Sequence, residues 1–97
     1  MGYLTTHILD TTQGCAAADV QIRLYQHDTA GQRQHLHTTK SNADGRCDQP
    51  LLAEKEFTAG IYELEFDIAD YFATQPNLPE ASTAPAFLGT VIIRFGI

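Results

Sequence analysis

Three stretches of the chain alternate between hydrophobic and polar positions with a period of two residues. They are LTTHILD at residues 4–10, DVQIRLYQH at 19–27 and GIYELEFDI at 60–68. This period is that of a β-strand with one face buried. The pattern therefore predicts three half-buried strands, whose inward-facing positions are Leu4, Thr6, Ile8, Val20, Ile22, Leu24, Tyr62, Leu64 and Phe66.

The segments between these strands carry turn residues. DTAGQ, residues 28–32, predicts a hairpin loop, because its glycine can adopt the positive φ that tight turns need. RQHLHTTK, residues 33–40, is the return strand of that hairpin. SNADGR, residues 41–46, is a second turn, since Asn and Asp-Gly favour tight turns. FLGTVIIRFGI, residues 87–97, predicts a last strand with Arg94 directed outward.

One short segment has helical spacing. In IADYFAT, residues 68–74, Ile68, Tyr71 and Phe72 form an apolar stripe about two turns long. Asp67 stands where an N-cap residue is expected. The next segment, residues 75–86, contains three prolines and several small residues and predicts a loop.

These elements favour an all-β fold. Five or six strands joined mostly by tight turns, with one short helix, are typical of an antiparallel β-sandwich. The chain has 97 residues, and neither an internal repeat nor a change in composition divides it. We therefore expect a single domain over residues 1–97.

The net charge of −6 argues against two classes of partner. Nucleic-acid-binding domains usually carry a clustered basic patch, whereas the six Lys and Arg residues are scattered here. The same charge disfavours an anionic membrane surface, and no stretch approaches the roughly 20 apolar residues of a membrane span. The start of the chain does not resemble a signal peptide. Cys15 and Cys47 are expected to be free thiols, and the expected location is the cytoplasm.

Two groups of residues have side chains that could take part in chemistry but lack the partners that a site needs. His35 and His37 are two residues apart on a predicted strand, which would place both on one face, with His27 across the hairpin. A zinc or copper site needs at least one more ligand, so we predict no metal site and regard these histidines as exposed polar residues. Cys47 follows Arg46 and could have a lowered pKa, but no histidine is near it in sequence.

Four blocks of the sequence together resemble one known family. LTTHILDTTQGCAAADVQIRLY, NADGRCDQPLL, GIYELEFDIADYF and FLGTVIIRFGI match, in order and spacing, the 5-hydroxyisourate hydrolases, which are related to transthyretin. The most specific pieces are LTTHILD and NADGR. The resemblance implies a transthyretin-like sandwich of two antiparallel sheets. It also implies a homotetramer whose active sites lie where subunits meet, and a hydrolase of urate degradation that opens the lactam ring of its substrate without a cofactor.

Two site residues follow from the resemblance. The histidine of the LTTH block falls on His7, which is implied to be catalytic, and the arginine of the DGR block falls on Arg46, which is implied to bind substrate. In the family, a second catalytic histidine and a Tyr-Arg-Gly-Ser tail follow the IRF strand, so we expect the domain to be incomplete at its C-terminus.

The residues themselves leave alternatives open. From the pattern alone, His7 also fits a solvent-facing histidine, and Arg46 fits a turn arginine paired with Asp44 or Asp48. For the whole chain, a non-catalytic module that binds small ligands, or an interaction domain, is the alternative to the hydrolase.

Overall fold

The computed structural model describes residues 2–75 and 86–97. The strands are β1 (Tyr3–Leu4), β2 (Leu9–Asp10), β3 (Cys15–Ala16), β4 (Gln21–His27), β5 (Arg33–Lys40), β6 (Leu52–Ala53), β7 (Ile61–Asp67) and β8 (Thr90–Gly96). A short 3₁₀ helix, η1 (Glu54–Glu56), follows β6, and the α-helix α1 (Ile68–Ala73) follows β7. Among the described residues, no helix combines the length and the apolar character needed to cross a membrane.

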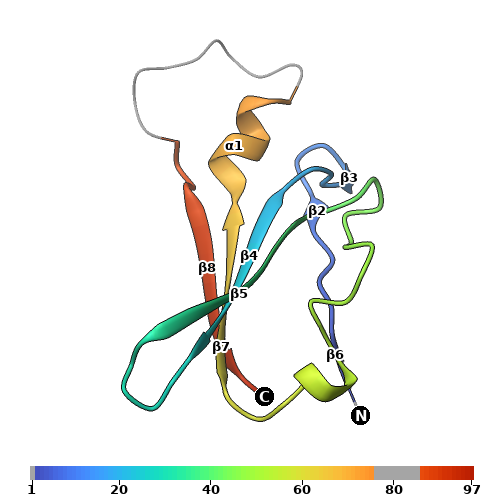
Figure 1. The fold of residues 1–97 in the computed structure, drawn as a ribbon. Coiled ribbons are helices and arrows are strands. Elements are labelled where there is room, and N and C mark those ends of the chain that lie inside the picture. Colours follow the sequence, from blue (N-terminus) through green and yellow to red (C-terminus); the bar gives the residue numbers. More distant parts are fainter. Residues whose placement is uncertain (1, 76–85) are drawn as a thin grey trace.

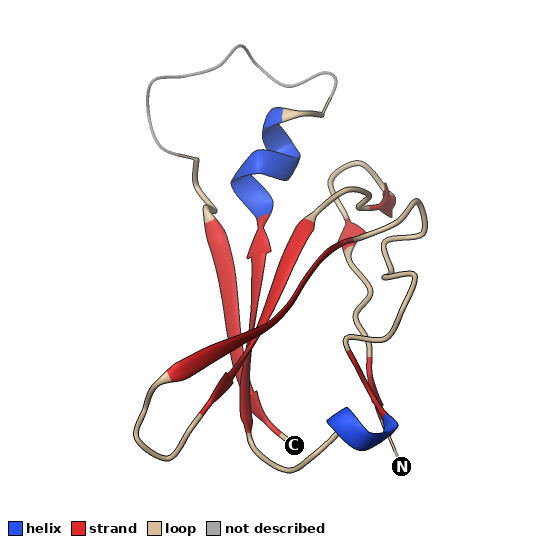
Figure 2. Cartoon of the chain, viewed as in Figure 1, coloured by secondary structure: helices blue, strands red, loops and turns tan. Residues whose placement is uncertain are grey.

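The long strands form one antiparallel sheet in the order β5-β4-β7-β8. The short strands pair as β1 with β6 and β2 with β3, and they lie beside this sheet as a second layer (Figure 1). Figure 2 shows that strands make up nearly all the regular structure and that the α-helix sits at one end of the long sheet. The predicted antiparallel β-sandwich with one short helix is confirmed.

The core lies between the two layers, as the alternating pattern predicts. Val20, Ile22 and Leu24 of the β4 segment are fully buried. Tyr62, Leu64 and Phe66 of β7 face the same side and are also buried, and Leu4 and Ile8 pack against this cluster from the second layer. Since a fully buried aliphatic or aromatic side chain contributes roughly 1.5–3 kcal/mol, this one cluster supplies most of the apolar stabilisation of the fold.

Two details of the fold differ from expectation. The stretch at residues 4–10 is not one strand but two short ones, β1 and β2, separated by an extended segment. The described residues therefore contain eight strands rather than five or six. The reason is that β1 pairs with β6 while β2 pairs with β3, so the segment changes partners along its length.

Asp67 occupies the N-cap position of α1, but its side chain makes no capping hydrogen bond. Instead it accepts two hydrogen bonds from the Arg23 guanidinium, at 2.6 and 2.7 Å. The predicted position is right and the predicted role is wrong, because a bidentate ion pair outcompetes a single bond to a backbone N–H. The loop predicted at residues 75–86 falls, except for its two end residues, outside the described part of the chain.

Candidate functional site

His7 lies on the open face of the second layer. From the end of β1 to the start of β2, exposure alternates. Leu4, Thr6 and Ile8 are half-buried, whereas Thr5, His7 and Leu9 are exposed. The alternation predicted from the sequence is therefore confirmed. The imidazole of His7 is accessible to water and to a ligand on this face.

Arg46 lies directly opposite His7. The two residues form an isolated antiparallel bridge, although their sequence separation is large. Residues that face each other in an antiparallel pair project their side chains from the same face. The bridge is extended by the Ile8 backbone N–H, which donates to the Gly45 carbonyl oxygen at 2.8 Å. The fold therefore brings an imidazole and a guanidinium to one accessible face.

The turn that carries Arg46 is held by Asn42. The Asn42 side-chain oxygen accepts hydrogen bonds from the backbone N–H groups of Asp44 and Arg46, at 2.9 and 3.1 Å. The Asn42 backbone N–H donates to the Arg46 carbonyl oxygen at 2.6 Å. Gly45 adopts a φ of 77°, a conformation that glycine tolerates best. These contacts fix the backbone of Arg46 and leave its side chain exposed.

Within the described residues, no ion pair joins Arg46 to Asp44 or Asp48. Asp48 instead accepts a hydrogen bond from the side-chain amide of Asn42 at 3.0 Å. The structure therefore does not support the alternative in which Arg46 is a turn arginine neutralised by a neighbouring carboxylate. The guanidinium keeps its hydrogen-bond donors for another partner.

Asp10, three residues after His7, is a structural carboxylate. It is buried and accepts hydrogen bonds from the Tyr71 hydroxyl at 2.7 Å and from the Gln13 backbone N–H at 3.0 Å. The bond from Tyr71, followed by that from Gln13, holds the pKa of Asp10 below its ordinary value. Burial, together with the Asp10 carboxylate, raises the pKa of Tyr71 to about 12. The sequence indicated the turn at Asp10 but not the contact with α1, which spans 61 positions of sequence.

The cysteines do not supply a nucleophile. Both are free, Cys15 exposed and Cys47 half-buried. Burial, and to a lesser extent the charge of Asp48, raises the pKa of the Cys47 thiol. This direction is opposite to the lowering considered from the sequence, and it disfavours the reactive thiolate.

The prediction that His35 and His37 share one face is wrong. His37 pairs with Leu24 and His35 pairs with Tyr25, so that Leu36 is an extra residue between them. This β-bulge turns the two imidazoles to opposite faces of the sheet. His35 contacts the Tyr25 ring edge-on, while His37 approaches Glu56 of η1. Among the described residues, no cluster of three or more His, Cys, Asp or Glu side chains is arranged for a metal ion.

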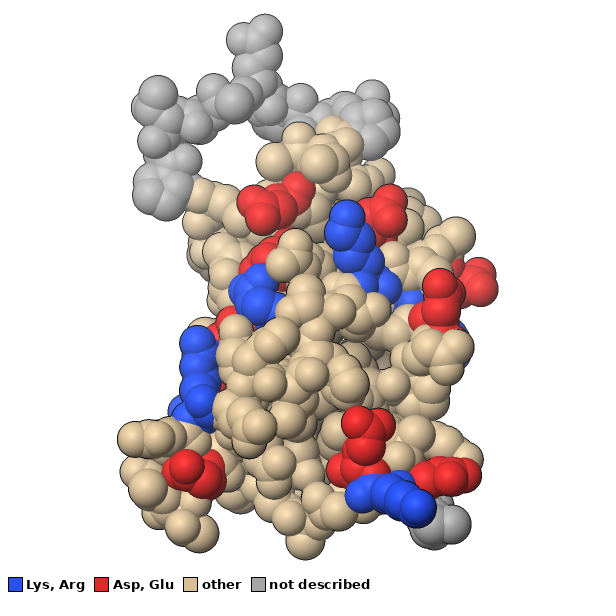
Figure 3. All heavy atoms as spheres, in the orientation of Figure 1, with Lys and Arg blue, Asp and Glu red and all other residues tan. Residues whose placement is uncertain are grey.

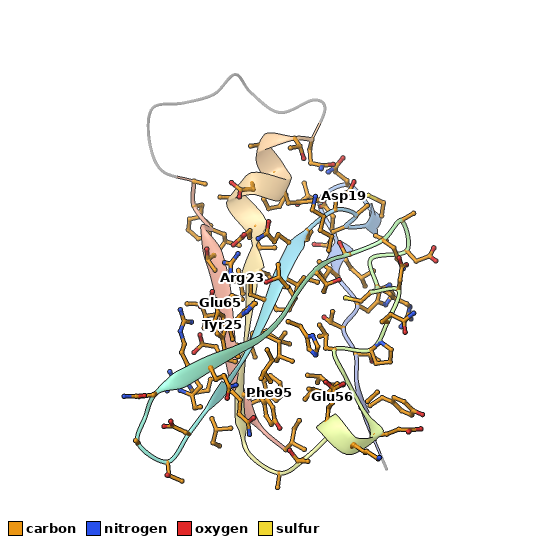
Figure 4. The ribbon with its side chains drawn as sticks, viewed as in Figure 1. Asp19, Arg23, Tyr25, Glu56, Glu65 and Phe95 are labelled. Carbon is orange, nitrogen blue, oxygen red and sulfur yellow. The ribbon has the colours of Figure 1, made fainter. Side chains whose placement is uncertain are left out.

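Sequence reasoning missed an ionic network on the outer face of the long sheet. The alternation puts Glu63 and Glu65 of β7 on the face opposite Tyr62, Leu64 and Phe66, yet both are buried, beneath arginine side chains. Arg33 donates to Glu63 at 2.7 Å and to Glu65 at 2.6 Å. Arg23 donates to Glu65 at 3.2 Å, and Figure 4 labels these two residues. The available signal was opposite charges on neighbouring strands, since Arg23 of β4 faces Glu65 and Arg94 of β8 faces Glu63. Figure 3 shows acidic and basic groups interspersed over one face of the molecule.

The His7–Arg46 pair is suited to hydrolysis. A neutral imidazole can accept a proton from water, and a positioned general base typically accelerates a reaction ~10²–10⁴-fold. A guanidinium presents a planar set of donors that fits carbonyl and anionic oxygens. Directed at a carbonyl under attack by water, it would stabilise the negative charge that develops on the oxygen.

Comparisons with known proteins point to the same chemistry. The family model described as HIUase/Transthyretin family matches residues 4–97. A 5-hydroxyisourate hydrolase of Mesorhizobium japonicum is 54% identical over 97 residues, covering 99% of this chain and 74% of that protein. One of Pseudomonas aeruginosa is 48% identical over 99 residues, covering 100% of this chain and 74% of that protein.

Solved structures share the fold. The crystal structure of an (S)-allantoin synthase superposes with a TM-score of 0.85 at 39% identity, covering 99% of this chain and 35% of that one. Sea bream transthyretin in complex with thyroxine superposes with a TM-score of 0.83 at 27% identity, covering 99% of this chain and 75% of that one. The fold is therefore common to a protein named as a synthase and to a transthyretin in complex with thyroxine.

Proposed function

Because this chain belongs to the HIUase/Transthyretin family and its fold places His7 opposite Arg46, we propose that it is a hydrolase that opens the lactam ring of 5-hydroxyisourate in urate degradation. The relatives that carry this name match nearly the whole chain at up to 54% identity. The single structural observation that carries the proposal is the bridge between the two residues. It joins the two most specific motifs of the sequence on one accessible face.

In the proposed reaction, the imidazole of His7 takes a proton from a water molecule as the water oxygen attacks the carbonyl carbon of the lactam. Arg46 donates hydrogen bonds to the carbonyl oxygen and stabilises the oxyanion. The carbon–nitrogen bond then breaks, and the protonated His7 returns its proton to the ring nitrogen that leaves. Water is thus divided between a new carboxyl group and a new N–H group, and no cofactor takes part.

We also propose that the chain works as a homotetramer, with sites formed where subunits meet. Two features support this assembly. His7 and Arg46 lie on an open face that a single copy does not enclose. Within the described residues, β8 is an edge strand of the long sheet and exposes Ile92 and Ile93. Edge strands of this kind readily pair with another chain.

Two further proposals concern the domain and its location in the cell. Residues 1–97 form a single transthyretin-like domain, a view supported by the one hydrophobic cluster to which both layers contribute. The protein acts in the cytoplasm, which fits the two free thiols, because unpaired cysteines are usual in a reducing compartment.

The test is to follow by absorbance the decay of freshly generated 5-hydroxyisourate with the protein expressed from its complete gene. The wild-type protein is expected to accelerate the decay, and His7→Ala to lower kcat by ~10²–10⁴-fold. His35→Ala is the matched control, because His35 lies on the other sheet, and it is expected to retain the wild-type rate.

Arg46→Lys separates substrate binding from a structural role. Lysine keeps the charge but loses the planar donor set that binds substrate and stabilises the oxyanion, so kcat/KM is expected to fall about tenfold or more while the fold is retained. Absence of acceleration by the wild-type protein would overturn the hydrolase proposal. A near-normal rate in His7→Ala would remove His7 from the mechanism and favour the non-catalytic binding module instead.

A further inference from the structure

A cavity of about 270 Å³ opens between the two layers, away from the His7–Arg46 face. Its lining combines four polar side chains with two aliphatic ones, from β4, β5, β6, η1 and the turn that follows: Gln26, Leu36, His37, Leu52, Glu56 and Thr58. Neither His7 nor Arg46 is among them. The cavity is therefore separate from the proposed active site, and its role does not depend on the hydrolase.

The bulge in β5 builds this cavity. Because Leu36 is an extra residue, His37 takes the face of Leu24, the inner face of the sheet, and points towards η1. There its Nε2 lies 3.5 Å from Glu56 Oε2. β-bulges are frequently found where a strand must re-aim a side chain at a functional site. Without the bulge, His37 would share the outer face with His35, and the cavity would lose one of its polar walls.

The chemistry of the lining defines the ligand. Glu56 is an acceptor when ionised, and Gln26 and Thr58 can each accept as well as donate. Lys and Arg do not occur in the lining, and the chain carries a net charge of −6, so a cation is favoured over an anion. Leu36, which is half-buried, supplies an apolar wall that suits the flat face of a ring, whereas Leu52 is 2% exposed and adds little surface.

The size of the cavity fits one ring. An apolar cavity of about 150 Å³ is enough to hold benzene, so this larger and more polar one has room for a ring with a charged substituent. We propose that the cavity binds a small aromatic cation, with an amidinium or similar planar N–H group on Glu56 and the ring against the half-buried side chain of Leu36. An amidinium offers two parallel donors to a carboxylate, the arrangement that makes such pairs strong.

The test is a titration of the protein with benzamidine, followed through backbone amide chemical shifts. We expect saturable binding with a Kd on the order of 1 mM, as is usual for a ligand of this size. The shifts should centre on Leu36, Glu56 and Thr58. Benzamide, which has nearly the same shape without the charge, should bind at least tenfold more weakly.

Two substitutions in η1 make a matched pair. Glu56→Gln removes the exposed carboxylate that lines the cavity and should raise the Kd of benzamidine at least tenfold. Glu54→Gln removes an exposed carboxylate of the same helix that does not line the cavity, and should change the Kd less than twofold. Four outcomes would each overturn the proposal: no saturation by 10 mM, equal effects of the two substitutions, equal binding of benzamide, or shifts centred on His7 and Arg46.

Discussion

At the scale of single residues, Gly45 determines how closely the Arg46 turn approaches the strand that carries His7. A Cβ atom at position 45 would overlap the Ile8 carbonyl oxygen, and the φ of 77° already disfavours other residues. Gly45→Ala is therefore expected to lower the free energy of unfolding by about 3 kcal/mol, of which the left-handed conformation alone accounts for roughly 1–2. It should also separate Arg46 from His7 and reduce hydrolysis. Urea denaturation and the decay assay measure these two effects.

Gly31 provides the control for this substitution. Its φ is 81°, but no atom lies within 4 Å of the position its Cβ would take. Gly31→Ala should thus show the conformational cost alone, about 1 kcal/mol, with normal activity. Equal losses of stability in the two variants would mean that the close approach to Ile8 does not matter.

The sequence singled out His7 and Arg46 as candidate site residues, but it did not show why they would converge. His7 and Arg46 stand in the most specific motifs of the chain, and the alternation of residues 4–10 already placed His7 on the exposed side. What brings them together is a backbone bridge supported by Asn42, whose side-chain oxygen accepts two N–H groups of the turn. The sequence shows that residues 41–46 form a turn, but not which distant strand the turn will meet.

At the scale of elements, the contact between Tyr71 and Asp10 ties α1 to the end of β2. The hydroxyl is buried and donates to a buried carboxylate at 2.7 Å. Hydrogen bonds to charged groups contribute roughly 1.5–3 kcal/mol, so Tyr71→Phe should lower the free energy of unfolding by about 2 kcal/mol in a urea titration. Tyr3→Phe is the control, because Tyr3 is exposed and its hydroxyl lies 3.4 Å from Glu54. A loss as large in Tyr3→Phe would contradict the assignment.

The ion pairs on the outer face of the long sheet make stability depend on pH. Burial alone would raise the pKa of Glu63, but hydrogen bonds from His27, Arg33 and Arg94 outweigh it and lower the pKa below its ordinary value of 4.5. Arg23 likewise lowers the pKa of Asp67 below 3.8. A lowered pKa means that the unfolded chain binds more protons. The contribution of Glu63 and Asp67 to the free energy of unfolding is therefore fully present above about pH 4.5, and it is lost as the pH falls through their lowered pKa values.

Glu63→Gln tests this dependence. The amide does not titrate, so the free energy of unfolding should fall less steeply below pH 4.5 than in the wild-type protein, although the variant is less stable at neutral pH. Asp44→Asn, in an exposed turn, should leave the acid dependence unchanged. The measurement is a series of denaturation curves between pH 7 and pH 2. If the free energy of unfolding falls equally steeply below pH 4.5 in Glu63→Gln and in the wild-type protein, this network does not cause the acid dependence.

The strands of the long sheet were largely predictable, and two errors about their side chains have one cause. Residues 33–40 were predicted as a strand and form β5 with those bounds, and β4 and β7 match within one or two residues. The errors concern the direction of side chains. A bulge in β5 reversed His35 relative to His37, and cross-strand arginines buried Glu63. Both effects depend on the neighbouring strand. The alternation of residues within one strand contains no information about that neighbour.

At the scale of the whole molecule, two layers share one core, and the proposed site residues His7 and Arg46 lie on the exposed side of the smaller layer. The class of fold followed from the alternation of residues and from the resemblance of four blocks. The arrangement of the layers, with β1 and β2 on different partners, required the structure. The exposed face that carries His7 and Arg46 and the edge strand β8 of the larger layer are the two surfaces on which the proposed homotetramer rests.

Self-association through β8 is the last prediction. Ile92 and Ile93 are 58% and 49% exposed on opposite faces of this edge strand, so their burial between copies would favour pairing. The double substitution Ile92→Lys and Ile93→Lys places charge on the edge, which is how natural edge strands avoid pairing. It should shift association to at least tenfold higher protein concentration in sedimentation velocity, and activity should fall with it. Ile61→Lys, 48% exposed on a strand with neighbours on both sides, should sediment as the wild-type protein does. Dissociation by Ile61→Lys, or no effect of the double substitution, would place the subunit interface elsewhere.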